Sequence, residues 1–487
     1  MARFIGLDVG TTSAKGVVVD EAGAVLGGAE EPYPLLTPRP GWTEQDPDTW
    51  WAASERVLAA LDAARADGIG LSGQMHGLVA LGDDNRPLRP AILWNDGRTQ
   101  REVEALEARV SRARLIALTG NRALAGFTAP KLLWMAAHEP ELYRRVRRVL
   151  LPKDYVRLRL CGEHATDVSD ASGTLLFDVA HRRWSGELLE ALGIDPALMP
   201  RALESPAVSG RTADGVPVAA GAGDQAAGAV GAGVTVPGGP ASVVLGTSGV
   251  AFAARERHAP DPEGRLHAFC HAVPGLWHVM GVTLSAAGSL QWLRDRIAPG
   301  VDFATLDAEA ARWRPGAEGL LFAPHLAGER TPWFDPAARA AFAGLSLRHD
   351  RGAMVRAVME GVAFSLRDCL DLVAAGGEAP ARVRVSGGGA RSELWLELLA
   401  AVLGVPVETT AVETSAAYGA ALLGAVAADA FPDVPAAVAA CVRTTRTLEP
   451  DAALARRYAE LRPAFQALYP ALREVRAAAP DPDQGAP

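Results

Sequence analysis

Three short glycine-rich segments have the residue types that bind phosphate. Phosphate binds to backbone N–H groups in turns that side chains do not obstruct, and the segments 10–13 (GTTS), 246–249 (GTSG) and 387–389 (GGG) have this character. A single Gly-Thr turn is usually an ordinary hairpin turn, because Gly and Thr suit turns without any ligand. Two of the segments follow a strand that begins a domain, so a nucleotide site and a set of ordinary turns both stay open.

The kind of nucleotide site follows from the motifs that are missing. A P-loop has Lys directly after its last Gly, but the three lysines, Lys15, Lys131 and Lys153, follow Ala or Pro. The dinucleotide fingerprint GxGxxG at a strand-to-helix turn and the nucleophile elbow GxSxG are also missing. The remaining way to hold ATP is between two domains, with turns from each binding the phosphates.

Two aspartates lie where a phosphoryl-transfer site needs carboxylates. Asp8 stands inside an apolar strand, two residues before the first Gly-Thr turn, and a buried carboxylate is costly unless it is paired or bound to a metal. This position predicts a Mg²⁺-linked role, with an Asp bonded to turn amides as the alternative. Asp224 lies among small residues in the segment 221–228 (GAGDQAAG), where a substrate can approach closely. Its alternative role is an N-cap for a helix from Gln225 onward, and the two roles are compatible.

Two polar clusters predict a pocket for a polyol. In the segment 73–77 (GQMHG), Gln74 and His76 flank Met75, and the segment 94–98 (WNDGR) follows an apolar strand. A lone His in such a place is more often a core or turn residue than a ligand. Together, however, the clusters supply several hydrogen-bonding side chains beside an apolar wall, which is what a polyol pocket needs.

Composition narrows the class of protein. The 487 residues suffice for two to four domains, and 48 Lys and Arg against 57 Asp and Glu give a formal net charge of −9, which argues against nucleic-acid binding through bulk positive charge. The four cysteines are more than seventy residues apart and are expected to be reduced core thiols. No secretory signal is recognised at the N-terminus, and the uncharged run 225–254 is interrupted by Gly and Pro, so we expect a cytoplasmic protein with no membrane span.

The order of elements suggests an internal duplication. Residues 4–26 predict an antiparallel meander of three strands, and residues 241–253 repeat the pattern of strand, Gly-Thr-Ser turn and strand. Apolar residues at three- and four-residue steps predict a helix from 354 to about 375. A strand at 383–386 leads into the three glycines, after which Ser392 is predicted to cap a helix over 393–403.

Taken together, these residues resemble the FGGY family of carbohydrate kinases. The resemblance runs from residue 3 to about residue 430 and rests on eight segments in order: GLDVGTTS at 6–13, GQMHG at 73–77, LWNDGR at 93–98, LPKDY at 151–155, GAGDQ at 221–225, LGTSG at 245–249, GERTP at 328–332 and SGGGARS at 386–392. Two family signatures usually have polar residues where Ala137 and Ala353 stand, and we expect both to lie on helix surfaces. The resemblance implies an α/β fold of two ribonuclease-H-like domains, as in actin, Hsp70 and sugar kinases, around a central cleft. We place the N-terminal domain at 1–235, the C-terminal domain at 240–476 and a flexible tail at 477–487.

The resemblance also implies a reaction and a set of site residues. The expected reaction is phosphorylation of D-xylulose at its 5-hydroxyl by ATP with Mg²⁺, since the segments at 73–77 and 93–98 differ from those of glycerol kinases and favour a ketopentose. Asp224 would be the general base and Asp8 would hold Mg²⁺. The residues expected to bind sugar, besides Asp224, are Met75, His76, Trp94, Asn95 and Gln225. Those expected to bind ATP are Thr11, Thr12, Ser13, Lys15, Gly246, Thr247, Gly388, Gly389 and Ser392.

Two other functions stay open from the sequence. One is a kinase of the same family for another ketose or polyol, such as ribulose or a deoxy-ketose. The other is an ATP-driven binding module like actin or Hsp70, which would transfer phosphate only to water. The expected partners are a small sugar and Mg·ATP, without nucleic acid or membrane, and a homodimer is possible.

Overall fold

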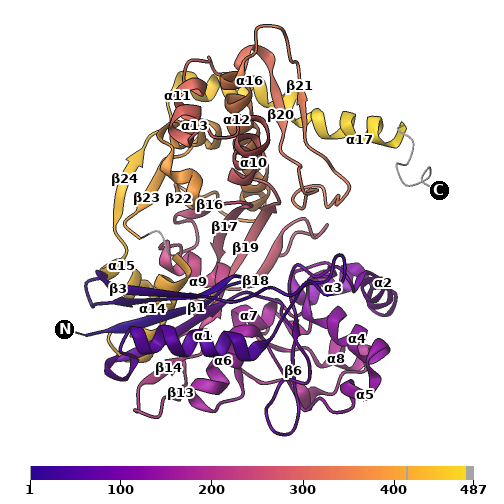
Figure 1. Cartoon of the computed structure of the whole chain (residues 1–487), viewed down its shortest axis with the longest axis vertical. Helices are drawn as coiled ribbons and strands as arrows, with labels where there is room; N and C mark the ends of the chain where they lie inside the picture. Colours follow the sequence, from indigo (N-terminus) through magenta and orange to yellow (C-terminus); the bar gives the residue numbers. More distant parts are fainter. Residues whose placement is uncertain (1, 413–414, 479–487) are drawn as a thin grey trace. The chain divides into compact units, whose positions relative to one another are not determined.

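The computed structural model of the chain describes residues 2–412 and 415–478. They form two compact units (Figure 1), and each unit gathers several segments of chain. The first contains Met1–Pro237, Ala254–Val279 and Val412–Arg443, and the second contains Gly238–Ala253, Met280–Ala411 and Thr444–Pro487. The predicted domains, 1–235 and 240–476, are each one continuous segment, whereas each unit here combines three segments. The domain limits stay a prediction.

A mixed sheet forms the centre of the first unit. Its strand order is β13-β14-β5-β1-β2-β3, with β15 beside β5. The central strand β1 is antiparallel to β2 and parallel to β5, so the predicted meander at the N-terminus is confirmed. The strands are β1 (Phe4–Val9), β2 (Ser13–Val19), β3 (Val25–Pro32), β5 (Gly68–Gly73), β13 (Val208–Arg211), β14 (Pro217–Ala219) and β15 (Ala222–Gly223).

Helices cover both faces of this sheet. Alternate side chains of a strand point to opposite faces, so apolar residues of β1 contribute to a core on each side. Ile5, Leu7 and Val9 of β1 pack in one core with residues of α1 (Pro47–Ala60) and α6 (Pro152–Cys161). Phe4 belongs to the other core, with α9 (Asp224–Gly231), α14 (Ser415–Ala427) and α15 (Val434–Cys441). Asp8 has the same parity as Phe4 and therefore points to the face that α9 covers.

Glycines let α14 approach the sheet at backbone distance. A Cβ atom added at Gly6 of β1 would lie 1.8 Å from the Ala417 carbonyl oxygen, and one added at Gly70 of β5 would lie 1.8 Å from that of Ala420. Both distances are far below van der Waals contact. The two central strands therefore require glycine where α14 crosses them.

Further elements complete the first unit. Its other helices are α2 (Gln100–Arg109), α3 (Arg112–Thr119), α4 (Thr128–His138), α5 (Pro140–Tyr143), α7 (Val168–Ser172) and α8 (Gly186–Leu192). Short strands pair outside the main sheet: β4 (Glu44–Gln45) with β7 (Ala91–Ile92), β6 (Val79–Leu81) with β8 (Arg148–Leu150), β9 (Ala165–Asp167) with β12 (Arg201–Leu203), and β10 (Phe177–Asp178) with β11 (Arg183–Trp184). Strand β18 (His267–Cys270) also lies in this unit.

The second unit repeats the plan of the first sheet. Its sheet contains β19-β17-β16-β22-β23-β24 in that order, and β16 is antiparallel to β17 and parallel to β22, as β1 is to β2 and β5. This shared pattern supports the predicted duplication. The strands are β16 (Ala241–Leu245), β17 (Gly249–Arg255), β19 (Trp277–Thr283), β22 (Val383–Ser386), β23 (Val407–Thr410) and β24 (Thr444–Leu448).

The remaining elements of the second unit include the two predicted helices. Both are confirmed: α12 covers Arg351–Ala375, and Ser392 caps α13 (Glu393–Leu403) by accepting a 3.1 Å hydrogen bond from the Trp395 N–H. The others are α10 (Ala287–Ile297), α11 (Phe303–Ala310), α16 (Ala452–Gln466), α17 (Leu468–Ala478) and the strand pair β20 (Leu321–Ala323) and β21 (Ala341–Ala343). Residues 479–487 of the predicted tail lie outside the described residues, and 477–478 end α17.

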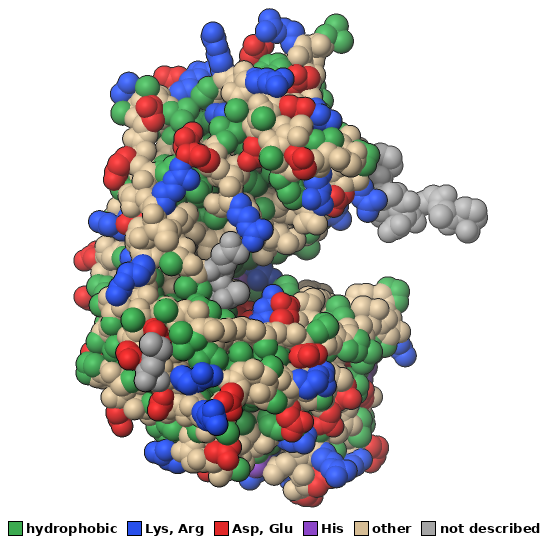
Figure 2. Space-filling view, turned by 60° about the vertical axis from the view of Figure 1, so that its left-hand side comes forward, with side chains coloured by type: hydrophobic (Ala, Val, Ile, Leu, Met, Phe, Trp, Pro, Cys, Tyr) green, Lys and Arg blue, Asp and Glu red, His purple; other side chains and the backbone are tan. Residues whose placement is uncertain are grey.

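The predictions for Ala137 and Ala353 have different outcomes. Ala137 is exposed as predicted, but the prediction for Ala353 is wrong, because this residue is buried in the first turn of α12. The four cysteines are free thiols. In the described part of the chain, no helix has both the length and the apolar character needed to cross a membrane. Figure 2 shows Lys and Arg side chains interspersed with Asp and Glu over the face in view.

The close approach of α14 to the sheet generates a stability prediction. Gly70→Ala should lower the melting temperature by several degrees, because overpacking costs about 1–3 kcal/mol or more and the backbone of α14 must move. Gly27→Ala is the matched control, since Gly27 also lies in a strand and its added Cβ would meet nothing within 4 Å. Thermal unfolding of the two variants checks this, and equal melting temperatures would contradict the packing.

Candidate active site

Three parallel strands of the first unit end at one edge of the sheet. Strands β1, β5 and β15 are parallel neighbours, so the segments that follow them emerge at the same edge. These segments are the Gly10–Thr12 turn, the Gln74–His76 segment and the start of α9 at Asp224. The tertiary structure thus brings together residues that the sequence separates by about 60 to more than 200 positions. This sheet edge is the candidate active site of the first unit.

A hydrogen-bond network holds the Gly10–Thr12 turn. The buried Gln74 amide donates to the Gly10 carbonyl (3.1 Å) and to Gln45 Oε1 (2.9 Å), and Gln45 Nε2 donates to the Thr11 carbonyl (2.7 Å). Trp94 Nε1 donates to Thr11 Oγ1 (3.1 Å), and the Tyr33 hydroxyl donates to the Gly10 carbonyl (2.6 Å). Because the Gly10 and Thr11 carbonyls accept these hydrogen bonds, the turn is fixed before any ligand arrives.

Two residues predicted to bind ATP have a carboxylate partner in this structure. Ser13 Oγ donates to Glu30 Oε1 (2.7 Å), and Lys15 Nζ lies 3.3 Å from the same oxygen. Thr12 is exposed, and its carbonyl accepts a hydrogen bond from the Tyr33 N–H (3.1 Å). An ATP role for Ser13 and Lys15 therefore requires exchange of Glu30 for phosphate, and that role stays a prediction.

The carboxylate of Asp8 lies in surroundings that disfavour its charge. Strand register places it opposite Lys15 on β2 and Ser72 on β5, and directly opposed residues share a face of the sheet. Burial raises the pKa of Asp8, while the Ser72 hydroxyl and the Lys15 charge act in the opposite direction. Part of the residue is accessible, but Oδ1 is shielded from solvent and has no hydrogen-bond partner. An additional positive partner would relieve this atom.

The pKa of Asp224 is shifted in the same direction as that of Asp8. Burial first, and the negative charge of Asp8 second, raise the pKa of Asp224 to about 7. Asp224 is the first residue of α9, and Gly223 occupies the N-cap position without a side-chain cap. The alternative that Asp224 is the N-cap of this helix is therefore wrong. Its carboxylate has a pKa suited to exchanging protons near neutral pH.

The Asp8 and Asp224 pair fits Mg²⁺. In residues 2–412 and 415–478 no cluster of three or more His, Cys, Asp or Glu side chains could hold a metal by itself. Mg²⁺ does not need such a cage, because it is commonly bound by one or two carboxylates together with phosphate oxygens and water. Such an ion would give the shielded Oδ1 of Asp8 a partner. It would also reduce the repulsion between the charges of Asp8 and Asp224.

The predicted sugar-binding residues border the same edge. Met75 packs against Gly223, since a Cβ atom added there would lie 2.8–3.1 Å from the Met75 side chain. His76 Nδ1 lies 2.6 Å from the Gly173 carbonyl, and its ring packs edge-on against Phe127. Met75 is therefore beside Asp224 in space as well as beside His76 in sequence.

The other predicted sugar-binding residues differ in how they are held. Trp94 is 42% exposed while its indole N–H is bound to Thr11, so its ring presents a free apolar surface. Asn95 is exposed, and Gln225 follows Asp224 in the first turn of α9. Asp96, next to Asn95, is buried in an ion pair with Arg98 (2.7 Å) and supports the loop.

The second unit has a pocket at the corresponding sheet edge. Parallel strands β16 and β22 end at the two glycine turns, and the pocket of about 620 Å³ is lined by residues of both turns, including Gly246, Thr247, Gly388, Gly389 and Ser392. Gly387 has φ of 93°, and its added Cβ would lie 2.7 Å from the Leu245 carbonyl oxygen. Backbone contact between the turns therefore requires glycine there. All five predicted ATP residues of this unit meet in one pocket.

Sequence reasoning missed several residues of these sites. In the second unit, Gln291, Phe303 and Asp307 also line the pocket, and they come from α10 and α11, which the sequence motifs do not mark. In the first unit it missed Gln45, which stands just before a helix as a buried polar side chain. No local signal distinguishes any of these four residues, since Gln45 itself stands between Glu44 and Asp46 in the sequence.

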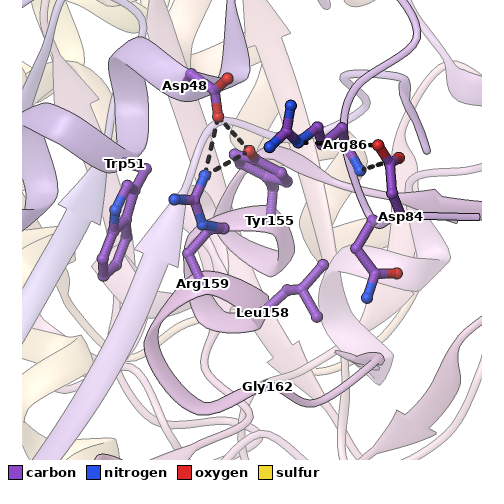
Figure 3. A pocket seen from close by; sticks show the side chains of 9 residues that line it. Asp48, Trp51, Asp84, Arg86, Tyr155, Leu158, Arg159 and Gly162 are labelled. Carbon is purple, nitrogen blue, oxygen red and sulfur yellow. Dashed lines mark hydrogen bonds and ion pairs between the residues drawn. The ribbon is translucent and has the colours of Figure 1, made fainter. Parts of the chain in front are cut away.

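A further cavity of about 510 Å³ lies on the first unit (Figure 3). The Asp48 carboxylate accepts hydrogen bonds from the Tyr155 hydroxyl and from Arg159 (3.0 Å), and Arg159 also lies over the Trp51 ring. Burial and this bond to Asp48 raise the pKa of Tyr155 to about 12. Because these polar groups already satisfy one another, the cavity offers them to no ligand without breaking that network.

Comparison with known proteins identifies the family. The model of the FGGY family of carbohydrate kinases, N-terminal domain, matches residues 3–231, and that of the C-terminal domain matches residues 241–428. The chain belongs to this family. Its fold is accordingly the two-domain α/β fold of FGGY sugar kinases, and it is a carbohydrate kinase by family.

Named relatives of this chain are similar over most of their length. A xylulose kinase of Escherichia coli is 43% identical over 440 residues, 88% of this chain and 90% of the relative. One of Klebsiella pneumoniae is 41% identical over 446 residues, 89% and 91% of the two chains. A solved structure described as a xyloylose kinase from Brucella ovis has a TM-score of 0.91 at 43% identity and covers 97% of this chain and 100% of its own.

The raised pKa of Asp224 predicts a pH-dependent stability. An unfolded Asp ionises near pH 4 and the folded Asp224 near pH 7, so the folded state loses stability as pH rises across this range. Asp224→Asn removes this loss. We expect its melting temperature relative to the wild type to be higher at pH 8 than at pH 5, measured with a chelator and without nucleotide. The exposed Asp214→Asn variant is the control and should show no such trend.

The pocket of the second unit predicts a selective nucleotide effect. A Cβ atom added at Gly388 would meet nothing within 4 Å, so Gly388→Val should fold normally while its side chain occupies space in the pocket. We expect KM for ATP to rise about tenfold or more, roughly 1.4 kcal/mol, with an unchanged melting temperature and sugar KM. Gly186→Val, equally open but at the start of α8, is the control. Unchanged KM for ATP would remove this pocket from nucleotide binding.

Proposed function

We propose that this protein transfers the γ-phosphoryl group of ATP to the 5-hydroxyl of D-xylulose, giving D-xylulose 5-phosphate and ADP. Relatives at 41–43% identity over about nine-tenths of the chain are xylulose kinases. The observation that carries the mechanism is Asp224, a carboxylate with its pKa raised to about 7 at the sheet edge where Asp8, Met75 and the Gly10–Thr12 turn meet.

Asp224 acts as the general base. In its ionised form it accepts the proton of the 5-hydroxyl as that oxygen attacks the γ-phosphorus, and the proton stays on the carboxyl until product release. A base is most effective when its pKa lies near the working pH, because it is then ionised often enough and still basic enough. Burial and the charge of Asp8 provide this property.

Asp8 would hold the metal ion that accompanies the ATP phosphates. When bound, Mg²⁺ neutralises charge on the β- and γ-phosphate oxygens. Asp8 would bind it through Oδ1 or through water, which gives that shielded oxygen a partner. Thr11, Thr12 and Thr247 would bind phosphate oxygens, and Gly246, Gly388, Gly389 and Ser392 would line the adenosine in the pocket of the second unit.

Met75, His76, Trp94 and Asn95 would bind the sugar. The thioether of Met75 and the exposed indole face of Trp94 offer apolar surface, while His76, Asn95 and Gln225 offer polar groups for hydroxyls. A site that pairs each hydroxyl discriminates against an analogue that leaves a buried group unpaired. This arrangement therefore favours a ketopentose over glycerol.

The alternatives differ in the acceptor of the phosphoryl group. A kinase for ribulose or a deoxy-ketose would use the same machinery with a different set of paired hydroxyls. An ATPase module would release ADP without any sugar, and the family membership of this chain argues against it. A homodimer stays a prediction.

A panel of sugars tests the proposed function. Purified protein with Mg·ATP is given D-xylulose, D-ribulose, a deoxy-ketose, gluconate or glycerol, and ADP release is followed in a coupled assay. We expect the highest kcat/KM with D-xylulose, poor turnover of glycerol, and little ADP without sugar. A higher kcat/KM with glycerol or gluconate would overturn the substrate assignment, and sugar-independent ADP release would favour the ATPase module.

Substitution of Asp224 tests the mechanism. Asp224→Asn should fold and bind ATP but lose roughly 10²–10⁴-fold in kcat, the usual effect of losing a general base. The wild-type kcat/KM should fall as pH drops below about 7, because the carboxyl becomes protonated and cannot accept the proton. A folded variant with kcat within threefold of wild type at saturating D-xylulose would exclude Asp224 as the base.

A further inference from the structure

His76 has a backbone conformation that its surroundings must enforce. Its φ is 70°, in the left-handed region that non-glycine residues seldom adopt. Such a conformation costs of the order of 1–3 kcal/mol and persists only where neighbouring groups over-determine it. Identifying these neighbours therefore shows what sets the direction of the His76 ring.

Two side chains of α4 bind the His76 carbonyl. Lys131 Nζ donates to this oxygen at 2.7 Å, and Thr128 Oγ1 donates to it at 3.1 Å. Both donors are one helical turn apart and buried, so neither bond competes with bulk water. Lys131 Nζ also donates to the Gly126 carbonyl at 2.7 Å, which ties the loop before α4 to the same ammonium.

Burying the Lys131 side chain carries a desolvation penalty that an apolar residue at this position would avoid. Its side chain is 0% exposed, and across residues 2–412 and 415–478 it forms no ion pair with a carboxylate. Burial holds the pKa of its ammonium well below the ordinary range, although the charge of Asp96 acts in the opposite direction. Methionine would fill similar space without this desolvation. What Lys131 adds is N–H donors for two carbonyls that would otherwise be buried without these bonds.

The His76 ring is fixed by a second set of contacts. Its Nδ1 lies 2.6 Å from the Gly173 carbonyl oxygen, and because that oxygen can only accept, Nδ1 carries the proton. In the neutral ring, Nε2 is then the acceptor, suited to a hydroxyl donor. Gly173 must be glycine for this contact, since its added Cβ would lie 2.7 Å from Nδ1.

We propose that Lys131 and Thr128 are positioning residues for sugar binding, which act by holding the His76 carbonyl and thereby the direction of the His76 ring. This inference rests on the proposed function insofar as His76 contacts the sugar. Neither residue touches the reacting atoms. Their loss should therefore weaken sugar binding far more than it affects ATP binding.

Kinetics of three variants provide the first test. Lys131→Met should raise KM for the sugar about tenfold or more, with KM for ATP within twofold, and Thr128→Val should raise the sugar KM about threefold. Thr119→Val is the matched control, because the Thr119 hydroxyl is equally buried and donates to the Leu115 and Asn121 carbonyls (2.9 and 3.1 Å) and not to that of His76. The sugar is whichever member of the panel the wild type uses best. An unchanged sugar KM in folded Lys131→Met and Thr128→Val would overturn the inference.

Histidine NMR gives a readout independent of activity. In protein with ¹³Cε1-labelled histidine and no substrate, the His76 signal is assigned by its loss in His76→Gln. It should move in Lys131→Met and in Thr128→Val but not in Thr119→Val, and an unmoved signal would overturn the inference. If Lys131→Met fails to fold, Thr128→Val decides by the same criteria. Failure of the wild type to phosphorylate D-xylulose would overturn the proposed substrate, while the NMR result would still decide the role of Lys131.

Discussion

The repulsion between Asp8 and Asp224 is the interaction on which the candidate site depends. Asp8 points to the sheet face that α9 covers, and Asp224 begins that helix, so two carboxylates meet where water is largely excluded. Such a pair is unfavourable by itself, because both carboxylates are desolvated and the charge of Asp8 raises the pKa of Asp224. The pair becomes useful when substrates bind. A cation then neutralises part of the negative charge, and the substrate hydroxyl needs a base to accept its proton. Stability is given up at this point in return for chemistry.

The packing of α14 on the sheet makes this arrangement rigid. Gly6 and Gly70 allow backbone contact with α14, and Gly419 of α14 in turn lies against the backbone of α9 near Ala227. Helix α9 and strand β1 therefore both pack against the same helix, α14, at backbone distance. A bulky residue at any of these contacts would shift one carboxylate relative to the other. The glycines thus act on the site although none of them belongs to it.

Buried polar side chains around the site serve backbone groups. Gln45 and Gln74 bind the carbonyls of the Gly10–Thr12 turn, and Lys131 binds those of His76 and Gly126. In each case the side chain supplies hydrogen-bond donors to backbone carbonyl groups of an irregular segment. The need to bind these carbonyls explains why polar side chains are buried under loops that face a ligand. Loops of this kind are rigid before binding, which lowers the entropy lost when substrate is ordered.

The sequence by itself determined the elements and the chemistry of individual residues. Alternating apolar residues predict β1 and β2, Ser392 predicts the start of α13, and the missing P-loop directs attention to separate glycine turns, because these properties depend on neighbours along the chain. The exposure of Ala353 could not be read in this way, since its burial depends on what covers the first turn of α12. Only the tertiary structure decided that Asp8 raises the pKa of Asp224, that Gln45 holds Thr11, and that Lys131 holds His76. These are contacts between segments from about 30 to more than 200 residues apart, and they arise from strand order and helix packing, which local sequence patterns do not encode.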